Sequence, residues 1–370
     1  MLIQCTKKLL DELKVTADPT IAPIEEDSLF SWHANIVKLG RRKALVLVND
    51  KNRYAIVLYG LKAKDMKNVD ALILQAIRET FKAVYIKDEV IEQFIQRSNP
   101  VVFSKTKDRT FVARMNKACG YVYYFEDLTD QEVIFQVEMS FKVSGILVGD
   151  GKNSYINPNE EMYKDLEELA GQPIFRSEAI ELKVTLCLEN YSVWRSIIVP
   201  THTTFDKLHR VLQIAFQWQN THLHEFYIYP IYTGDNVISI KKEKPIMHLV
   251  SDEEALSYQD DIPMEMEKGI KLSDYLPAKI VYNYDFGDGW EHEIKVERVI
   301  ENYEFNYPTC LYGEGNAPPE DVGGEPGYEE FLQIMGDKTH PDFEHMVKWG
   351  KKQGYREFDL IEVNRRLRVE

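Results

Sequence analysis

Histidines and carboxylates that could together bind a metal ion occur in the second half of the 370-residue sequence. His222 and His224 stand two residues apart, so an extended chain would place both imidazoles on one face. Asp285 and Asp288 lie further along, in a stretch rich in glycine and aromatic residues. Imidazole and carboxylate together suit zinc, manganese or iron, and an open coordination position can activate water. These four residues are therefore candidate ligands of a divalent metal ion.

The stretch around the two aspartates also has a structural interpretation, which is a β-hairpin. Residues 280–285 and 291–297 each show the alternation of a strand. Residues 287–289, Gly-Asp-Gly, supply positions that accept positive φ in a tight turn. On this interpretation the two aspartates cap the turn, and His292 on the apolar face is a core histidine. From the sequence, both interpretations remain open.

A second set of residues in the same half is the predicted lining of a pocket. Residues 310–324 are rich in glycine and proline, which predicts a long irregular loop. Because binding sites concentrate on such loops, we predict that His222, His224 and Asp285 or Asp288 meet at the mouth of a pocket beside residues 318–324. The candidate lining consists of Trp194, Arg195, His209, Tyr284, Trp290, His292, Glu320 and Asp321.

Three familiar catalytic motifs are excluded by their surroundings. Residues 285–287 spell the magnesium motif of kinases, but no glycine-rich loop precedes them. His224 begins a zinc-protease pattern, but Ile228 stands where the second histidine belongs. Residues 149–154 resemble a phosphate loop, but its first glycine would fall on Ile146. No reaction can therefore be assigned from a motif.

The elements that must position the candidate ligands are strands and one helix. Residues 181–188 alternate as a strand, and residues 193–199 are predicted to return beside them. A helix is expected from Thr203 or Thr204 to about Trp218, followed by a strand over residues 222–229.

The first half of the sequence is predicted to contain both strands and helices. Residues 32–39, 44–48 and 54–59 are strand-like and strongly apolar, which indicates burial on both faces. Helical periodicity marks residues 65–84, and a second helix is expected over residues 88–96. The whole chain is therefore predicted to be α+β.

Charge divides the sequence into two parts. Residues 1–172 carry 24 basic and 25 acidic side chains, a net charge of −1, whereas residues 173–370 carry 21 and 35, a net charge of −14. We take this step as a domain boundary, with domains over residues 1–172 and 173–370. Phosphate contacts need clustered Lys and Arg, so nucleic acid is an unexpected partner for the second domain. The basic run at residues 41–43 leaves DNA binding by the first domain open.

Composition predicts a globular cytoplasmic protein. Hydrophobic residues make up 44 %, and no apolar run approaches the length of a membrane span, so no membrane partner is expected. The first residues lack the pattern of a secretory signal. The four cysteines are far apart and form no CxxC pair, which fits a reducing compartment.

A series of short motifs in the second half resembles the plasmid pRiA4b ORF-3-like family over about residues 178–369. These motifs are residues 194–195, 208–209, 212–213, 222–226, 284–292, 310–315, 318–321, 323–324, 340–341 and 358–360, with Asn364. The resemblance implies an α+β domain of rolled antiparallel sheet and flanking helices, and members often lie near mobile elements. No catalytic residues follow from it. Although some members are labelled resolvases, Arg195 is the only arginine in these motifs, and a serine recombinase needs an arginine-rich site.

The first half resembles a family of domains without an assigned function, on residues 5–10, 32–35 and 41–43. We expect a two-domain accessory protein that binds a protein or a small ligand and is associated with a plasmid, transposon or defence locus. One alternative is a metal-dependent hydrolase that uses the His/Asp cluster of the second domain. A further alternative is DNA binding through the first domain.

Overall fold

The computed structural model describes residues 1–14, 27–151, 153–230, 244–257 and 261–368. It divides into two compact units, Met1–Arg176 and Ser177–Glu370, and each is described by itself. Within the described residues, no helix is long and apolar enough to cross a membrane.

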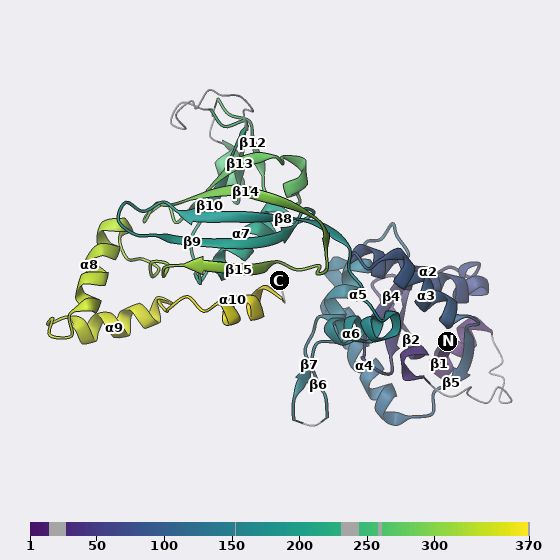
Figure 1. Cartoon of the computed structure of the whole chain (residues 1–370). Helices are drawn as coiled ribbons and strands as arrows, with labels where there is room; N and C mark the ends of the chain where they lie inside the picture. Colours follow the sequence, from purple (N-terminus) through teal and green to yellow (C-terminus); the bar gives the residue numbers. More distant parts are fainter. Residues whose placement is uncertain (15–26, 152, 231–243, 258–260, 369–370) are drawn as a thin grey trace. The chain divides into compact units, whose positions relative to one another are not determined.

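The first unit is built on a five-stranded mixed sheet (Figure 1). The strand order is β4-β3-β2-β1-β5, in which β1 runs parallel to both β2 and β5 and the other pairs are antiparallel. The strands are β1 Leu2–Cys5, β2 Ser31–Leu39, β3 Arg42–Asn49, β4 Ala55–Tyr59 and β5 Val102–Lys105.

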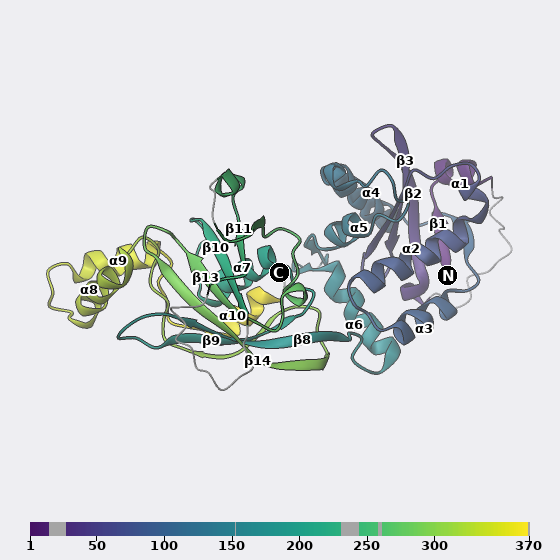
Figure 2. The same ribbon diagram turned by 90° about the horizontal axis from the view of Figure 1, so that it is seen from above.

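Helices cover both faces of this sheet, which Figure 2 shows from above. One core includes Trp32, Ile73 and Phe94, and the other includes Val46 and Met115. Alternate residues of the central strands enter the two cores, so the predicted burial on both faces is confirmed. The helices are α1 Lys7–Leu13, α2 Val69–Ala83, α3 Asp88–Ser98, α4 Arg109–Tyr124, α5 Val137–Ser144 and α6 Pro158–Ala170, and a small hairpin of β6 Val148–Gly149 and β7 Tyr155–Ile156 precedes α6.

The second unit is an eight-stranded sheet with the order β12-β11-β10-β13-β14-β8-β9-β15. All neighbours are antiparallel except β11 and β12. The sheet is not closed, and with its flanking helices it confirms the predicted α+β architecture. The strands are β8 Ser177–Leu186, β9 Val193–Pro200, β10 His224–Pro230, β11 Met247–Val250, β12 Met264–Met266, β13 Ala278–Tyr284, β14 Trp290–Tyr303 and β15 Thr309–Glu314.

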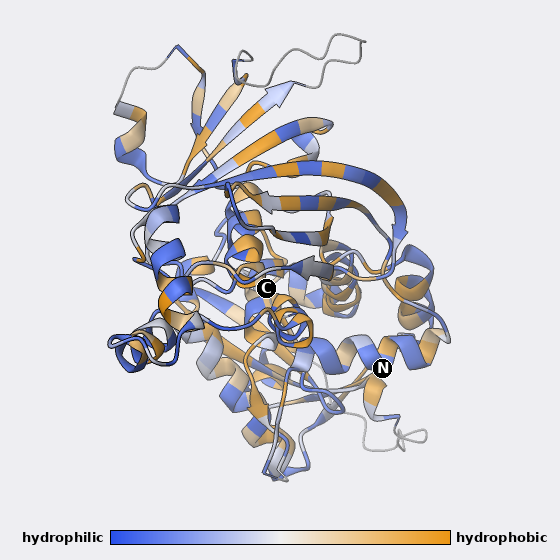
Figure 3. Cartoon of the chain, turned by 60° about the vertical axis from the view of Figure 1, so that its left-hand side comes forward, coloured by the Kyte–Doolittle hydropathy of each residue, from blue (hydrophilic) through white to orange (hydrophobic). Residues whose placement is uncertain are grey.

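One face of this sheet is buried against a helix, α7 Phe205–Ala215. Figure 3 shows hydrophobic and hydrophilic residues alternating along the strands, as a sheet with one buried face requires. The buried face includes Phe226, Tyr282, Tyr284 and Ile294. Three further helices follow the last strand: α8 Gly324–Gly336, α9 Phe343–Lys352 and α10 Leu360–Leu367.

The predicted hairpin is formed by β13 and β14, with Tyr284 opposite Trp290. The residues with positive φ in its turn are Asp285, at 56°, and Gly289, at 74°. Gly287 was expected to be one of them and is not. Asp285 takes the left-handed conformation because its Oδ1 accepts hydrogen bonds from the backbone of Gly287 and Asp288, the local bonding that lets aspartate occupy this region.

Two expectations about regular structure are corrected. Residues 310–324 are not irregular throughout, because β15 occupies their first part and pairs with β9. Gly313 in β15 permits close packing against Arg195, since an added Cβ would lie 2.6 Å from Cδ of Arg195. The strand expected over residues 222–229 begins only at His224, so His222 precedes the ladder and does not follow its alternation.

Candidate metal centre

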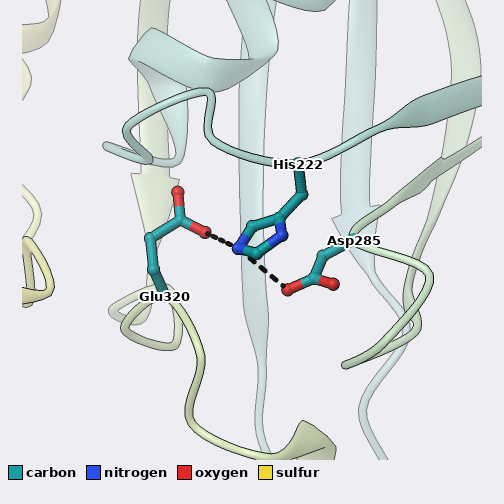
Figure 4. A group of neighbouring side chains, drawn as sticks. All are labelled: His222, Asp285 and Glu320. Atoms are coloured by element: carbon teal, nitrogen blue, oxygen red, sulfur yellow. Dashed lines mark ion pairs between the residues drawn. The ribbon is translucent and has the colours of Figure 1, made fainter.

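Three carboxylates surround the imidazole of His222. Its Nε2 lies 3.0 Å from Asp321 Oδ1, 3.5 Å from Asp285 Oδ2 and 3.8 Å from Glu320 Oε2. Figure 4 shows the ring directed at the carboxylates of Asp285 and Glu320. We call these four residues the His222 centre. The ion pairs join the segment before β10, the turn after β13 and the loop before α8, so only the folded chain brings the residues together.

The carboxylate of Asp285 is fixed by its own turn. Its Oδ1 accepts the backbone N–H groups of Gly287 and Asp288 at 3.0 and 3.3 Å. The other oxygen, Oδ2, is the one that faces His222. The residue is buried, so the turn holds the carboxylate in one orientation.

The carboxylate of Glu320 is fixed in the same manner by more distant parts of the chain. Its Oε1 accepts the backbone N–H of Gln219 at 2.8 Å and the hydroxyl of Tyr284 at 3.0 Å. Its Oε2 faces His222, with the Tyr284 hydroxyl also 3.3 Å away. Glu320 is only 1 % exposed, and burial raises its pKa above the usual range, although the Gln219 and Tyr284 hydrogen bonds act against this.

Asp321 is the third carboxylate of the His222 centre and lies at its exposed side. Its Oδ2 accepts a hydrogen bond from Nε2 of Gln353 at 3.1 Å, and its Oδ1 faces His222. Its backbone has a φ of 57°, and its side chain is 55 % exposed. Each of the three carboxylates therefore has one oxygen held by the protein and the other turned toward the same nitrogen.

The geometry around His222 Nε2 fits a cation better than a hydrogen bond. The atom is covered, and among the described residues it has no partner with hydrogen-bond geometry, although three oxygens lie near it. One atom from each of His222, Asp285 and Glu320 can be chosen so that all lie within 4.8 Å of one another. Ligand atoms at roughly 2.0–2.2 Å from an ion lie at most about 4.4 Å from one another. The three side chains would therefore need to move only slightly closer together to coordinate one ion.

His224, predicted as a ligand beside His222, belongs to a different group. Its Nε2 lies 2.9 Å from both carboxylate oxygens of Glu267, and its ring stacks on His209. Its position in the ladder opposite Tyr284 turns it onto the buried face, away from the exposed segment that carries His222. The expected approach of His224 to His222 is therefore wrong.

Asp288 also lies apart from His222 and caps the following helix. Its carboxylate accepts the backbone N–H of Gly323, the residue before α8, at 3.1 Å. Burial and the nearby Asp285 raise the pKa of Asp288, and backbone hydrogen bonds from residues 322–324 act in the opposite direction. The turn-capping alternative thus describes Asp285, which also faces His222, whereas Asp288 binds the backbone before α8 and not its own turn.

The remaining candidate pocket residues are packing residues. Arg195 is fully buried and donates to the carbonyls of Trp194, Ala215, Glu314 and Gly315. The Trp194 ring lies 4.9 Å from the ammonium of Lys183 and not at the His222 centre.

His292 and Trp290 are buried in the core beneath α7. His292 Nδ1 lies 3.2 Å from the carbonyl of Tyr282, and burial lowers the pKa of His292 to about 3, so it is a core histidine as in the alternative interpretation, although its Nε2 has no hydrogen-bond partner among the described residues. A pocket of about 500 Å³ does occur nearby, but its lining includes Leu223, His224 and Phe286 and none of the eight candidate residues.

Sequence reasoning missed several residues that support these groups. Glu267 and Gln353 had no local signal, because each is one polar residue in a segment without a motif. Tyr284 was expected at the pocket, but its role as donor to Glu320 was not. These contacts join residues that are distant in the sequence, so spacing alone could not reveal them.

Comparison with known proteins defines the class of the second unit. Residues 178–366 match the family described as plasmid pRiA4b ORF-3-like protein, which is half of the chain, and the chain belongs to this family. Residues 2–161 match a domain of unknown function, DUF6933. Both resemblances seen in the sequence are thereby confirmed.

Similar proteins carry no assigned function. The uncharacterized protein y4hQ of Sinorhizobium fredii is 34 % identical over 182 residues, which are 48 % of this chain and 84 % of that protein. The crystal structure of a protein of unknown function, MM3350 from Methanosarcina mazei, is 30 % identical and matches with a TM-score of 0.41. That match covers 50 % of this chain and 98 % of the other.

Proposed function

We propose that the second unit binds one divalent metal ion at the His222 centre and uses it for metal-assisted hydrolysis. The observation that carries the proposal is the common orientation of Asp285, Glu320 and Asp321, each of which turns one oxygen toward His222 Nε2. Outer hydrogen bonds that fix first ligands are a regular feature of metal sites. One imidazole with carboxylate oxygens suits manganese, iron or zinc.

Exposure of the centre supports hydrolysis over a purely structural ion. The His222 side chain is 28 % exposed and that of Asp321 is 55 % exposed, so water can approach from this side. A bound ion would supply Lewis-acid chemistry and activate that water. The neighbouring residues Leu223 and Phe286 are exposed and line the 500 Å³ pocket, which is the candidate place for a substrate.

Metal content tests the first part of the proposal. We expect the purified chain, stripped with a chelator and dialysed against Mn²⁺ or Zn²⁺, to retain one ion. His222→Ala and Glu320→Gln should weaken retention at least about tenfold. His340→Ala is the matched control, because His340 also lies near a carboxylate of this unit, 4.0 Å from Asp342, but outside the centre. Equal retention by wild type and His222→Ala would contradict the proposal.

Activity tests the second part. The loaded protein should hydrolyse a member of a panel of p-nitrophenyl esters and phosphates, and Glu320→Gln should remove this activity. Stoichiometric metal without turnover would refute the hydrolase. It would favour the competing expectation, an accessory protein of a mobile element or a defence locus that binds a protein or a small ligand.

A further inference from the structure

Three cationic side chains of the first unit converge on one small pocket without a carboxylate among its lining. Arg53, Arg114 and Lys117 line this pocket together with Tyr121. Its volume is about 40 Å³. A water molecule needs roughly 10–15 Å³ by the same measure, so the pocket accepts a group of a few heavy atoms, such as one phosphate.

The absence of counter-charges distinguishes these cations from their neighbours. Elsewhere on the unit, Lys51 pairs with Asp165 and Arg78 with Glu92. Among the described residues, Arg53, Arg114 and Lys117 form no ion pair. Burial and the nearby Arg114 lower the pKa of Arg53, an effect that Asp150 partly offsets. The three cations thus outnumber the one carboxylate that acts on Arg53, Asp150, and leave a net positive charge that an anion would neutralise.

Arg53 is held in place by the turn between β3 and β4. Its backbone N–H donates to Asn49, and its guanidinium donates to the carbonyl of Gly149 in β6. Its φ of 66° is a conformation that a residue without a locally bonding side chain seldom adopts. The guanidinium is therefore positioned before any ligand arrives.

Aromatic side chains continue from the pocket along α4. Arg114, Lys117, Tyr121 and Tyr124 follow at intervals of three or four residues, so they form one stripe on the helix. The Lys117 ammonium lies 5.9 Å from the Tyr121 ring centre, and Tyr124 is 78 % exposed. The stripe spans about 15 Å, at 1.5 Å per residue.

We propose that the first unit binds single-stranded nucleic acid along α4, with a backbone phosphate among Arg53, Arg114 and Lys117 and with bases stacked on Tyr121 and Tyr124. Cations that follow the backbone and aromatic rings that accept unpaired bases are the two components of such sites. A duplex cannot present base faces to Tyr124, which favours the single strand. This binding is independent of the metal centre.

Fluorescence anisotropy of the full chain with a labelled oligo(dT) of about twelve nucleotides tests the proposal. One neutralised phosphate predicts a slope of log affinity against log salt of about −0.7 between about 50 and about 200 mM. Lys117→Ala should flatten this slope and weaken binding. The matched control is Lys82→Ala, an exposed lysine on α2, which packs in the other core of the sheet.

Three further variants separate charge from stacking. Tyr124→Ala should weaken binding several-fold, whereas Tyr124→Phe should retain it. Arg53→Gly removes one cation at a position where glycine is conformationally favoured, so binding should fall without a lower melting temperature. Equal binding by wild type and the Arg114→Ala, Lys117→Ala double variant would overturn the proposal. So would equal affinity for duplex DNA, or displacement of the oligonucleotide by equimolar pyrophosphate.

Discussion

His209 and His224 stack face to face, with ring centres 3.4 Å apart and planes within 2° of parallel. His209 also contacts the Tyr282 hydroxyl through Nδ1 at 2.8 Å and Asn220 Oδ1 through Nε2 at 2.7 Å. His224 contacts Glu267. Two protonated rings in this arrangement would repel each other at close range. The pKa of His209 is lowered to about 3, mainly by burial and secondly by the electrostatic effect of His224.

The buried histidines predict an acid-sensitive fold. The folded pKa is about 3 for both His209 and His292, whereas unfolded histidine titrates near 6.5. Between these values the unfolded chain takes up protons that the folded chain does not, so stability should fall as pH decreases from about 6.5 toward 3. The slope should be on the order of 1 kcal/mol per pH unit for each histidine. Urea unfolding at a series of pH values measures it.

His209→Gln and His292→Gln provide the comparison for this slope. Each removes one group with a lowered pKa, so each should flatten the dependence of unfolding free energy on pH. A slope that neither variant changes would mean that other groups cause the acid sensitivity.

The second prediction concerns the support of Glu320 by Tyr284. Tyr284→Phe removes the hydroxyl that donates to Glu320 at 3.0 Å. Ion binding should weaken about tenfold, because outer hydrogen bonds fix the orientation of first ligands. Tyr312→Phe is the control, since the Tyr312 hydroxyl contacts Glu181, outside the centre. Metal titration followed by calorimetry compares them, and equal affinities would show that the hydroxyl is not a supporting group.

Arg195 should be among the most sensitive residues of the second unit. Its guanidinium is buried, donates four hydrogen bonds to carbonyls and lies 3.9 Å from the Phe358 ring centre. The single ammonium group of lysine cannot make these four hydrogen bonds, so Arg195→Lys should lower the unfolding free energy by about 3 kcal/mol. Arg298→Lys alters an ion pair with the buried Glu181 but keeps its positive charge, and the Arg298 side chain is 63 % exposed, so the unfolding free energy should change by less than about 1 kcal/mol. Urea unfolding of both variants gives the comparison.

A side chain at Gly315, the residue after β15, should cause a strong steric clash. The φ of Gly315 is 74°, and an added Cβ would lie 2.2 Å from the carbonyl oxygen of Ser192. Gly315→Ala should therefore destabilise by more than about 1 kcal/mol. Gly336→Ala has no atom within 4 Å of the new Cβ and lies in α8, so it should be neutral or stabilising. Melting temperatures distinguish the two, and similar values would argue against the close approach of β15 to residue 192.

The fifth prediction is that the second unit folds alone. Hydrophobic clusters form within each unit, and the division falls at Arg176 and Ser177. A chain of residues 177–370 should show one cooperative melt. A gradual transition without a heat-capacity peak would mean that the second unit needs the first.

Local pattern was sufficient for much of the architecture. The alternation around Tyr284 and the glycines after it predicted the β13–β14 hairpin, because a strand's two faces and its turn are set by neighbouring residues. Helical periodicity predicted α2 for the same reason. The family resemblance then supplied the rolled sheet, which no local pattern contains.

The composition of the His222 centre depended on contacts that sequence spacing does not encode. His222 and His224 are two residues apart, yet one precedes the ladder and the other lies within it, so they separate. Asp285 and Glu320 are distant in the chain, yet the hairpin turn and the hydrogen bond from Tyr284 bring them to one nitrogen. The sequence by itself determined the residue types, the strands and the helices, because these follow from neighbours along the chain. Only the tertiary structure decided which carboxylates share an imidazole, because that depends on how distant segments pack.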